Sequence, residues 1–361
     1  MTRSSHRQPA PEPEVWRALK AEGRLSFGRY MELALYGKGG FYTESVRIGG
    51  AGGDFYTAAQ IPLFAAILAR AAAEAWEAFG RPAAWQVVEW GGGQGEMAEA
   101  MASALGSRLP DGVHVRYTLV DVSESLVQRQ RLRLEDGQRR VVFDWGQPAE
   151  ELPTFAFANE VLDALPVERV RRANGNRWEQ TDVVWDGHGL SLDWRPAHPD
   201  VAAFAEAHLP IPVGIEAEVC LALRPFFARV ARLGRPLRAL FFDYGIRSEE
   251  WASGLRPQGT VRAYRAHQVV DPLTDPGRCD ITADVHWEAA MASAEAAGLR
   301  VVRLQNQGSF LMAAGAVEVL EAQITGPTTG RLEAARWTGQ FKQLVLPGGM
   351  GERFQVLELE A

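Results

Sequence analysis

The segment VVEWGGGQGEMAEAM, residues 87–101, places three glycines at alternate positions shortly after an acidic residue. Gly91, Gly93 and Gly95 carry no Cβ atom, so the backbone can turn sharply there and approach a ligand closely. A short β-branched run precedes the turn, and a helical pattern follows it. A strand that enters such a turn and continues into a helix N-terminus forms a crevice for a nucleotide-like ligand.

The residues around the turn separate three kinds of site. A dinucleotide fingerprint needs a third glycine where Glu96 stands, and a Walker loop needs a Gly-Lys-Ser/Thr ending that Gln94, Gly95 and Glu96 do not supply. Glu89 at the rim would repel a pyrophosphate, but it can pair with an ammonium group. S-adenosylmethionine carries such an amine, so the segment favours a methyl donor. A turn that binds no ligand stays open as an alternative.

Acidic residues also end the next two predicted strands, residues 117–121 and 141–143. Asp121 can accept two hydrogen bonds from ribose hydroxyls, although an aspartate there can also cap a helix. Asp144 can accept a hydrogen bond from an exocyclic amine, and Trp145 can stack on adenine. These three residues are therefore predicted to contact the nucleoside part of the donor.

The fourth predicted strand, residues 154–158, ends at Asn159 and Glu160, and Asp163 follows three residues later. In a parallel sheet this point lies beside the first strand, where a sulfonium would face its acceptor. Carboxylates match a planar guanidinium in bidentate fashion. Methyl transfer depends mostly on in-line positioning, so these residues are candidates for the acceptor side. The alternative is a helix N-terminus whose first-turn acids suit the helix dipole.

The elements that position these residues alternate between short buried strands and helices. Residues 96–105 follow the first strand as a helix, and Ser123 is a predicted cap for the helix that runs to residue 134. This alternation is typical of an α/β fold with a doubly wound, mostly parallel sheet. The ligand of such a sheet lies outside the carboxyl ends of its strands.

Outside this core we expect a disordered tail over residues 1–14, and a helical segment with a glycine-rich lid over residues 15–80. Residues 81–361 form the core, with an insertion at about residues 167–235. Strand-like runs at 167–172, 178–185 and 190–194, separated by Asn-Gly and Asp-Gly turns, predict an antiparallel meander in that insertion. Residues 301–304 and 308–312 are predicted as a strand pair, and residues 341–346 and 354–359 as a closing hairpin.

The composition of the chain excludes several classes of function. The chain has 361 residues, 47% of them hydrophobic, and a net charge of −7, which argues against a general nucleic-acid binder. We find no apolar run of about 18 residues for a membrane helix and no signal peptide, and therefore expect a cytoplasmic protein without a membrane partner. Cys220 and Cys279 lie too far apart to suggest a metal site, so no metal is expected. A homodimer is left open.

Several segments together resemble one family, the MidA-like class I methyltransferases, which include the mitochondrial complex I assembly protein arginine methyltransferase. The resemblance begins near residue 24 and keeps one order along nearly all of the remaining chain. Besides the glycine turn, it is carried by SFGRYM (26–31), GDFYTA (53–58), NEVLDALPV (159–167), FDYG (242–245), GTVRAYR (259–265), DITADV (280–285), GSFL (308–311) and MGERF (350–354).

The resemblance implies a Rossmann-like core of seven strands, S-adenosyl-L-methionine as cofactor with S-adenosyl-L-homocysteine as product, and an arginine of a protein as substrate. It implies donor contacts from the glycine turn, the ribose side and an N-terminal lid, with Asn159 near both donor and acceptor. The implied donor residues are Glu89, Gly91, Gly93, Asp121, Asp54 and Thr57. The implied acceptor-side residues are Asn159, Glu160 and Asp163.

The chain departs from the family pattern at several positions. Gly92 and Gln94 stand where the family commonly has a proline and a basic residue, Gln60 replaces a lid carboxylate, and Asp284 replaces a histidine. These departures leave the cofactor assignment intact but weaken the acceptor assignment. Two alternatives therefore stay beside the methyltransferase: a donor-binding assembly protein with reduced turnover, and a nicotinamide-dependent oxidoreductase.

Overall fold

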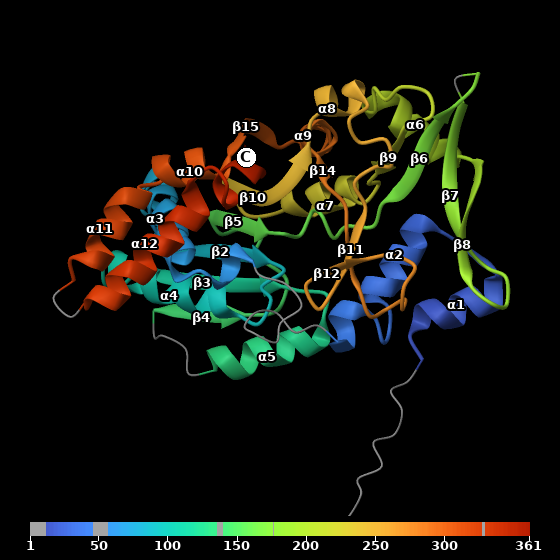
Figure 1. Cartoon of the computed structure of the whole chain (residues 1–361). Helices are drawn as coiled ribbons and strands as arrows, with labels where there is room; N and C mark the ends of the chain where they lie inside the picture. The colour runs from blue at the N-terminus through green and yellow to red at the C-terminus, as the bar shows by residue number, and fades with distance from the viewer. Residues whose placement is uncertain (1–11, 46–56, 136–139, 176, 327–328) are drawn as a thin grey trace, which may run out of the picture.

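A mostly parallel sheet forms the centre of the molecule (Figure 1). The structure is a computed structural model that describes residues 12–45, 57–135, 140–175, 177–326 and 329–361. The strands lie in the order β15-β16-β10-β5-β2-β3-β4, and β14 pairs with β10. They are β2 (Ala84–Trp90), β3 (His114–Val120), β4 (Val141–Asp144), β5 (Thr154–Asn159), β10 (Leu237–Ile246), β14 (Val285–His286), β15 (Arg300–Asn306) and β16 (Phe354–Glu360).

Strand directions confirm the predicted fold class. β4, β3, β2, β5 and β10 are parallel neighbours, whereas β16 runs antiparallel to both β10 and β15. Because these five strands are parallel, their carboxyl ends meet at one edge of the sheet. This is the Rossmann-like sheet expected from the alternation of strands and helices.

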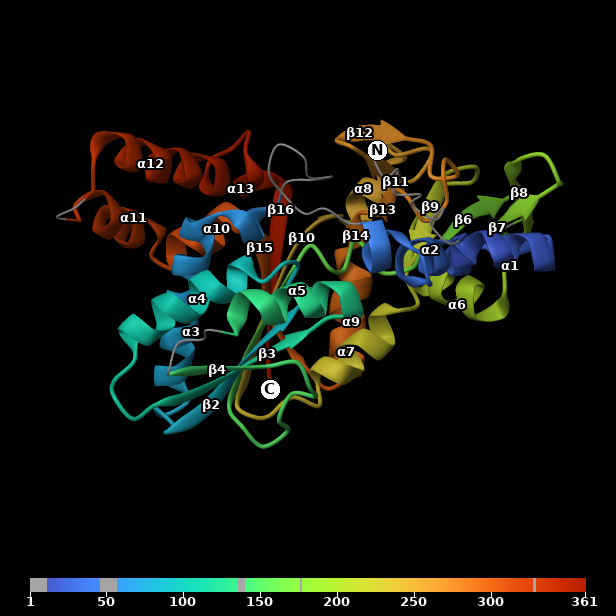
Figure 2. The same cartoon turned by 90° about the horizontal axis from the view of Figure 1, so that it is seen from below.

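Both faces of the sheet are covered because the side chains of each strand alternate between two cores. On β10, Leu240 and Phe242 belong to one core, and Ala239 and Phe241 belong to the other. The first core contains α3 (Pro62–Ala78) and α4 (Glu96–Arg108). The second contains α7 (Leu223–Val230) and α9 (Trp287–Ala296). Figure 2 shows these two pairs of helices on opposite sides of the strands.

A second sheet joins the N-terminal segment to the insertion. Its strands are β1 (Arg24–Ser26), β6 (Glu168–Ala173), β7 (Arg177–Trp185), β8 (Leu190–Pro196) and β9 (Glu216–Val219). β6, β7 and β8 form the predicted antiparallel meander, and β1 pairs antiparallel with β7. The helices beside this sheet are α1 (Glu14–Glu22), α2 (Phe27–Tyr36) and α6 (Pro199–His208).

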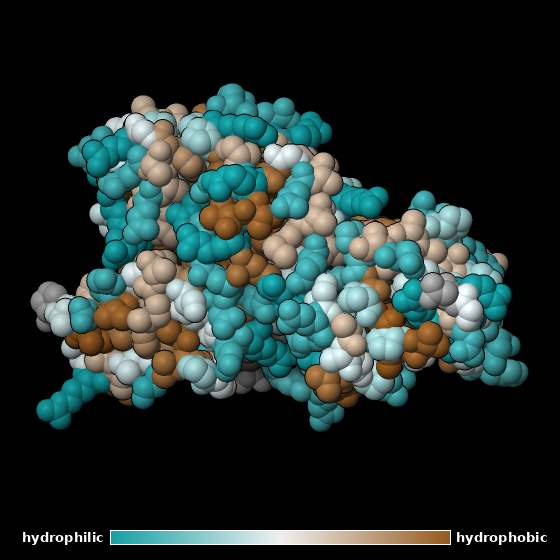
Figure 3. All heavy atoms as spheres, turned by 90° about the horizontal axis from the view of Figure 1, so that it is seen from above, coloured by the Kyte–Doolittle hydropathy of each residue, from teal (hydrophilic) through white to brown (hydrophobic). Residues whose placement is uncertain are grey.

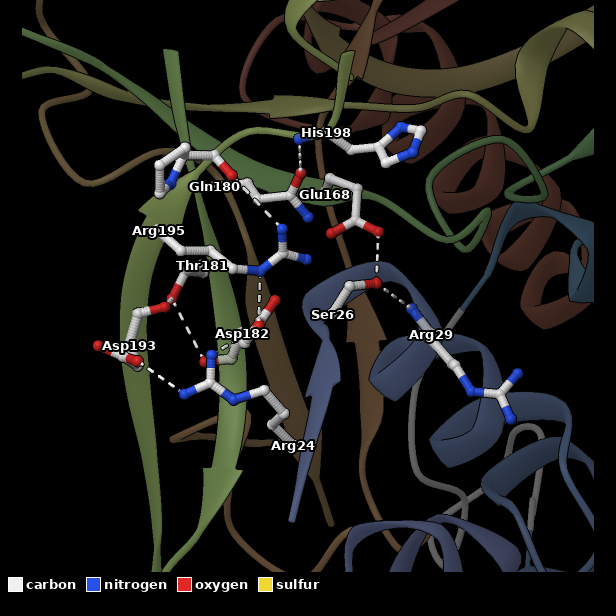
Figure 4. Close-up of polar contacts among 11 residues, drawn as sticks. Arg24, Ser26, Arg29, Glu168, Gln180, Thr181, Asp182, Asp193, Arg195 and His198 are labelled. Carbon is white, nitrogen blue, oxygen red and sulfur yellow. Dashed lines mark hydrogen bonds and ion pairs between the residues drawn. The ribbon is translucent and has the colours of Figure 1, made fainter. Parts of the chain in front are cut away.

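Polar contacts reinforce the junction between β1 and the meander (Figure 4). The Arg24 guanidinium lies 3.4 Å from the buried Asp182 carboxylate, which also accepts a 2.6 Å hydrogen bond from Arg195. The Ser26 hydroxyl donates to Glu168 over 2.6 Å. The start of α2 is therefore held against the insertion, and this contact helps to fix the side of the cavity that α2 lines.

A third, smaller sheet and several helices complete the fold. A small sheet contains β11 (Arg262–Arg265), β12 (Gln268–Val270) and β13 (Asp280–Thr282). The others are η1 (Phe41–Ser45), η2 (Ala58–Gln60), α5 (Glu124–Leu134), α8 (Ser248–Ser253), α10 (Gln307–Ala313), α11 (Ala316–Ile324), α12 (Arg331–Val345) and α13 (Met350–Arg353).

Two predicted strands near the C-terminus are helices. Residues 308–312 belong to α10, so the predicted strand pair with residues 301–304 is wrong. Residues 341–346 lie almost wholly in α12, so the predicted closing hairpin is wrong as well. Trp337, Phe341, Leu344 and Val345 pack on the first core at the three-to-four-residue spacing of a helix face. The other half of the predicted hairpin, β16, instead pairs with β10 and β15.

In the described part of the chain, no helix combines the length and the apolar character that crossing a bilayer requires. The surface face in Figure 3 shows several separate apolar patches divided by hydrophilic side chains.

Candidate functional site

A cavity of about 550 Å³ opens at the carboxyl edge of the central sheet. Its wall contains the turn after β2, the residues after β3 and β5, and Tyr244 near the end of β10. The N-terminal segment adds Tyr36, Tyr42 and Thr57, and the later part of the chain adds residues from β13 and α13. Most predicted site residues therefore converge where a parallel sheet is expected to bind its ligand.

The glycine turn has the backbone conformation that its composition predicted. Gly91, Gly93 and Gly95 have φ angles of +65°, +54° and +86°, a region that residues with a Cβ rarely occupy. A Cβ added to Gly91 would lie 2.7 Å from Cγ2 of Val161. Gly91 and Gly93 line the cavity, and Gly95 directly precedes α4. The bare backbone at Gly91 therefore forms a cradle that even a methyl group would fill.

Glu89 lies beneath this turn and does not line the cavity. Burial raises its pKa to about 7, although the Tyr117 hydroxyl, which donates to Glu89 over 2.7 Å, acts in the opposite direction. The Glu89 carboxyl carbon would lie 3.7 Å from a Cβ added to Gly92. A cation bound above the turn would favour the ionised form of this carboxyl group. Its contact with the donor's ammonium group stays a prediction.

Asp121 follows β3 directly and lines the cavity. Burial raises its pKa to about 6, and hydrogen bonds from the Ser123 amide (2.9 Å) and from Gln130 (3.0 Å) partly oppose that shift. Ser123 also caps α5 as predicted, because its hydroxyl accepts the amide of Leu126. The carboxylate is thus held at the rim, where its predicted role is to bind ribose hydroxyls.

Gln130 is a site residue that the sequence analysis missed. Its side chain is fully buried and donates both to Asp121 and, over 2.9 Å, to the carbonyl of Gly93. Its carbonyl oxygen accepts a 3.1 Å hydrogen bond from the Trp145 indole. One amide therefore ties the glycine turn to the acidic residue after β3. The only signal in the sequence was a polar residue at an inward-facing helix position.

Asp144 and Trp145 lie beside the cavity rather than in its wall. Partial burial would raise the pKa of Asp144, but hydrogen bonds and charge from Arg116 prevail and lower it. The Arg131 guanidinium lies over the Trp145 ring at 5.0 Å. Their contacts with adenine stay a prediction. Asp54, predicted as part of the lid, lies outside the described residues.

Two of the predicted acceptor-side residues, Asn159 and Glu160, are hydrogen-bonded to Thr57, which is predicted as part of the lid. The Thr57 hydroxyl donates to Glu160 over 2.6 Å, and the Asn159 amide donates to Thr57 (2.9 Å) and to Glu160 (3.0 Å). Glu160 has a φ of +54°, a strained backbone conformation of the kind found at functional sites. Burial raises the pKa of Glu160, against the effect of these hydrogen bonds.

Asp163 shares a desolvated region with two other carboxyl groups. Burial and the charge of Glu160 hold its pKa well above the ordinary range, and burial and the charge of Asp163 do the same for Asp243. Asp243 accepts the amides of Leu162 (3.0 Å) and Asp163 (3.2 Å), and the Tyr244 hydroxyl donates to Oδ2 of Asp163. Three neighbouring carboxyl groups in a low-dielectric region do not all ionise without a cation.

Two tyrosines that no sequence pattern predicted also line the cavity near Asp163. Tyr36 and Tyr42 are stacked, with ring centroids 5.5 Å apart. The Tyr36 hydroxyl donates to the carbonyl of Ala164 (2.8 Å), and the Tyr42 hydroxyl donates to Asp280 (2.9 Å).

In the described residues, no group of histidine, cysteine and acidic side chains could hold a metal ion.

Comparisons with known proteins agree with this geometry. Residues 67–305 match a family of S-adenosyl-L-methionine-dependent methyltransferases. The chain is 27% identical to the mitochondrial protein arginine methyltransferase NDUFAF7 of Danio rerio, over 93% of this chain and 83% of the fish protein. It is also 27% identical to the Xenopus laevis protein of the same name, over 74% of this chain and 66% of the frog protein.

A solved structure from Burkholderia thailandensis, bound to S-adenosyl-homocysteine, superimposes with a TM-score of 0.84 at 31% identity. The match covers 98% of this chain and 95% of that one. A native structure from the same organism superimposes with a TM-score of 0.80 at 29% identity. These matches do not support the nicotinamide-dependent oxidoreductase.

The relatives correct one expectation. Those from Xenopus laevis, Danio rerio and Rattus norvegicus are all mitochondrial proteins, which contradicts the cytoplasmic location expected from the N-terminal sequence. Absence of an apolar signal peptide was a weak basis for that expectation, because mitochondrial targeting segments are amphipathic rather than apolar.

The site suits an adenosyl cofactor with an amino-acid tail. The features that suit it are the glycine cradle at Gly91, the carboxylate of Asp121 at the rim and the order of the strands. Together with the family match and the bound product in the similar structure, they confirm S-adenosyl-L-methionine as the cofactor. The chain belongs to the MidA-like family of S-adenosyl-L-methionine-dependent methyltransferases.

Proposed function

We propose that the chain transfers the methyl group of S-adenosyl-L-methionine to the guanidinium of an arginine in a protein. The relatives that share its sequence over most of its length are named protein arginine methyltransferases. Identity of 27% does not fix a substrate, so the proposal depends on the chemistry of the acceptor side of the cavity.

Two oxygen atoms carry the proposal, one on the last residue of β5 and one in the loop that follows it. Oδ1 of Asn159 and Oδ1 of Asp163 are buried and find no hydrogen-bond donor in the described part of the chain. An unpaired buried acceptor costs free energy, and a ligand that donates to it removes that cost. A guanidinium offers five N–H donors and no acceptor, so it matches a pair of unpaired acceptors.

The charge of the cavity points to the same class of acceptor. Among the described residues that line it, six are acidic and two are basic. These are Glu32, Glu96, Asp121, Glu160, Asp163 and Asp280 against Arg229 and Arg353. A cationic acceptor would allow the desolvated carboxyl groups to ionise, whereas an anionic acceptor would have to overcome them.

These residues divide the work of an in-line transfer. When bound, S-adenosyl-L-methionine supplies an electrophilic methyl group. Gly91, Gly93 and Asp121 would hold the donor, with Asp54 and Thr57 as its lid. Asn159, Glu160 and Asp163 would orient the acceptor nitrogen and accept its proton. Since positioning supplies most of the rate enhancement in such a transfer, rigid hydrogen bonds around these groups are expected.

The test uses donor labelled in its methyl group, an arginine-containing peptide library, and mass spectrometry of the products. Wild type should form methylarginine. Asp163→Asn should bind the donor with unchanged affinity by calorimetry and transfer at least about 100-fold more slowly, because it loses a proton acceptor. Label found only on lysine, glutamine or a small molecule would refute the proposed substrate. Binding of donor without any transfer would instead support an assembly protein with reduced turnover.

A further inference from the structure

We propose that Tyr244 is a positioning residue for Asp163: its hydroxyl occupies Oδ2, so Oδ1 alone is presented to the acceptor nitrogen and receives its proton. The identity of the acceptor and the role of Asp163 as its proton acceptor rest on the function proposed above. The arrangement of Tyr244 and Asp163 itself is independent of that function.

The ring of Tyr244 is held in one place. It lies near the carboxyl end of β10, where the strand pairs with β16 through Tyr244 and Phe354. Phe354 contacts the ring edge to face, with centroids 5.6 Å apart, and the Arg353 guanidinium lies 5.4 Å from the ring centroid. Contacts with a ring edge and with a cation leave the ring little freedom to rotate away.

The hydroxyl of Tyr244 is held as well, because both of its hydrogen bonds are used. Its single proton is donated to Oδ2 of Asp163, so its oxygen accepts the hydrogen bond from the Thr282 side chain. Burial and the charge of Asp163 hold the pKa of Tyr244 well above 10, so the hydroxyl remains a donor at neutral pH. The two hydrogen bonds are therefore donated in one direction, from Thr282 to Tyr244 and from Tyr244 to Asp163.

The backbone of Asp163 is fixed from two sides. Its amide donates to Asp243 over 3.2 Å, and its carbonyl accepts the amide of Ala283 over 2.9 Å. With Oδ2 bound to Tyr244, the carboxyl group has one oxygen left. That oxygen, Oδ1, is buried and without a donor in the described residues. The free oxygen is thus the one position where Asp163 can meet an acceptor nitrogen.

The chemistry at this oxygen balances without a further reactant. As the nitrogen–carbon bond to the methyl group forms, the carbon–sulfur bond breaks and its electron pair stays on sulfur. The nitrogen then loses one proton, which passes to Oδ1 of Asp163. A carboxylate that could rotate would offer this proton two acceptors in variable geometry, whereas the hydrogen bond from Tyr244 leaves one.

Several ionisable groups surround Asp163 and set the pH at which it can accept this proton. They are Glu160 after β5, Asp243 and Tyr244 on β10, Asp280 on β13, Tyr36 on α2, Tyr42 on η1, and Arg353 of α13 against the Tyr244 ring. Burial and the acidic neighbours raise the pKa of Asp163, whereas the amide of Ala164 and the hydrogen bond from Tyr244 lower it. Removal of that bond should raise it further.

The first experiment compares Tyr244→Phe with Tyr30→Phe. Tyr30 is also buried, and its hydroxyl donates to the carbonyl of Pro272 over 2.7 Å without lining the cavity. Tyr244→Phe should leave the affinity for the donor unchanged. It should lower kcat by about 10-fold to 100-fold, which is the usual contribution of a hydrogen bond to a charged group. It should also move the acidic limb of the pH profile of kcat to higher pH. Tyr30→Phe should lose stability without moving that limb.

Thr282→Val is the second variant, because it keeps the shape of the side chain and removes the hydrogen bond to Tyr244. Since a hydroxyl that accepts a hydrogen bond is a stronger donor, Thr282→Val should move the acidic limb in the same direction by a smaller amount. An unchanged pH profile in both Tyr244→Phe and Thr282→Val would overturn the proposal, whatever happens to stability.

A readout that needs no acceptor separates this inference from the proposed function. The titration of Asp163 can be followed by NMR of aspartate labelled with ¹³C at Cγ, with the signal assigned by its loss in Asp163→Asn. If this titration moves to higher pH in Tyr244→Phe while wild type forms no methylarginine, the positioning role stands and the substrate is wrong. If wild type forms methylarginine but the titration is the same in both proteins, the substrate stands and the positioning role is wrong.

Discussion

Replacement of Gly91 by alanine isolates the feature on which donor binding depends. At a φ of +65°, a residue with a Cβ loses about 1–2 kcal/mol relative to glycine. The new methyl group would also lie 2.7 Å from Cγ2 of Val161, about 1 Å inside an ordinary carbon–carbon contact. Overpacking of this kind typically costs about 1–3 kcal/mol. We therefore expect Gly91→Ala to lose roughly 2–5 kcal/mol of unfolding free energy.

The affinity for the donor should fall as well, since Gly91 and Val161 both line the cavity and a shift of either one changes the space that the donor needs. If about 1.4 kcal/mol of the cost falls on binding, the dissociation constant rises about tenfold. Calorimetry with S-adenosyl-L-homocysteine measures the change in the dissociation constant, and thermal unfolding measures the loss of unfolding free energy. Val161→Ala in the Gly91→Ala background should recover part of the affinity, because it removes Cγ2 but leaves the φ angle unchanged.

Gly112→Ala is the matched control. Gly112 has a φ of +86°, a Cβ added there would meet nothing within 4 Å, and it does not line the cavity. It should therefore lose stability through backbone strain and keep the wild-type affinity for the donor. Should Gly91→Ala bind the donor as wild type does, and lose no more stability than Gly112→Ala, the assignment of the glycine turn as the donor's cradle would be wrong.

Two further variants test the groups around the turn. Glu89→Gln should change how stability depends on pH. The pKa of Glu89 is about 7 in the folded protein against an ordinary value of 4.5, so this carboxyl group takes up a proton on folding. Its contribution to stability is fully present below about pH 4.5 and is lost as pH rises through about 7. Denaturant unfolding of wild type and Glu89→Gln across that range should show the difference between them shrinking or reversing as pH rises; a constant difference would mean that Glu89 does not titrate there. Gln130→Ala should weaken donor binding about tenfold or more and lower the unfolding free energy by about 2–4 kcal/mol, since it removes the amide that joins Gly93 to Asp121 and leaves a cavity. Calorimetry and thermal unfolding measure both, and a loss of stability at unchanged affinity would make Gln130 a residue of the core alone.

The central fold could be predicted because its signals are local. A β-branched strand, a glycine turn and an amphipathic helix in succession specify their own conformations, and their order fixes a parallel sheet. The C-terminal error arose where local signals are ambiguous. Residues 341–346 form a short apolar run that suits a strand or a buried helix equally, and only packing against the first core decides between them.

The candidate site was predictable in its acidic residues but not in their partners. Asp121 and Asp163 follow strands in the sequence, so their place at the sheet edge follows from topology. Gln130 and Tyr244 act through contacts with residues 9 and 81 positions away, and no short-range pattern specifies such pairs. The same holds for Asp144, whose carboxylate pairs with Arg116 on the neighbouring strand rather than pointing into the cavity.

The small space between Gly91 and Val161, which a Cβ would overfill, also couples the proposed donor and acceptor sides of this cavity. Val161 follows Glu160, whose positive φ already strains the loop after β5, and it precedes Leu162, whose amide is bound by Asp243. The space above Gly91 is therefore bounded on one side by the donor's cradle and on the other by the loop that carries Glu160 and Asp163. A side chain at Gly91 would press on that loop, and a shift of the loop would press on the cradle. If the turn holds the donor and the loop holds the acceptor as proposed, glycine at this position lets the two halves of the site lie close together, since a Cβ would lie 2.7 Å from Val161.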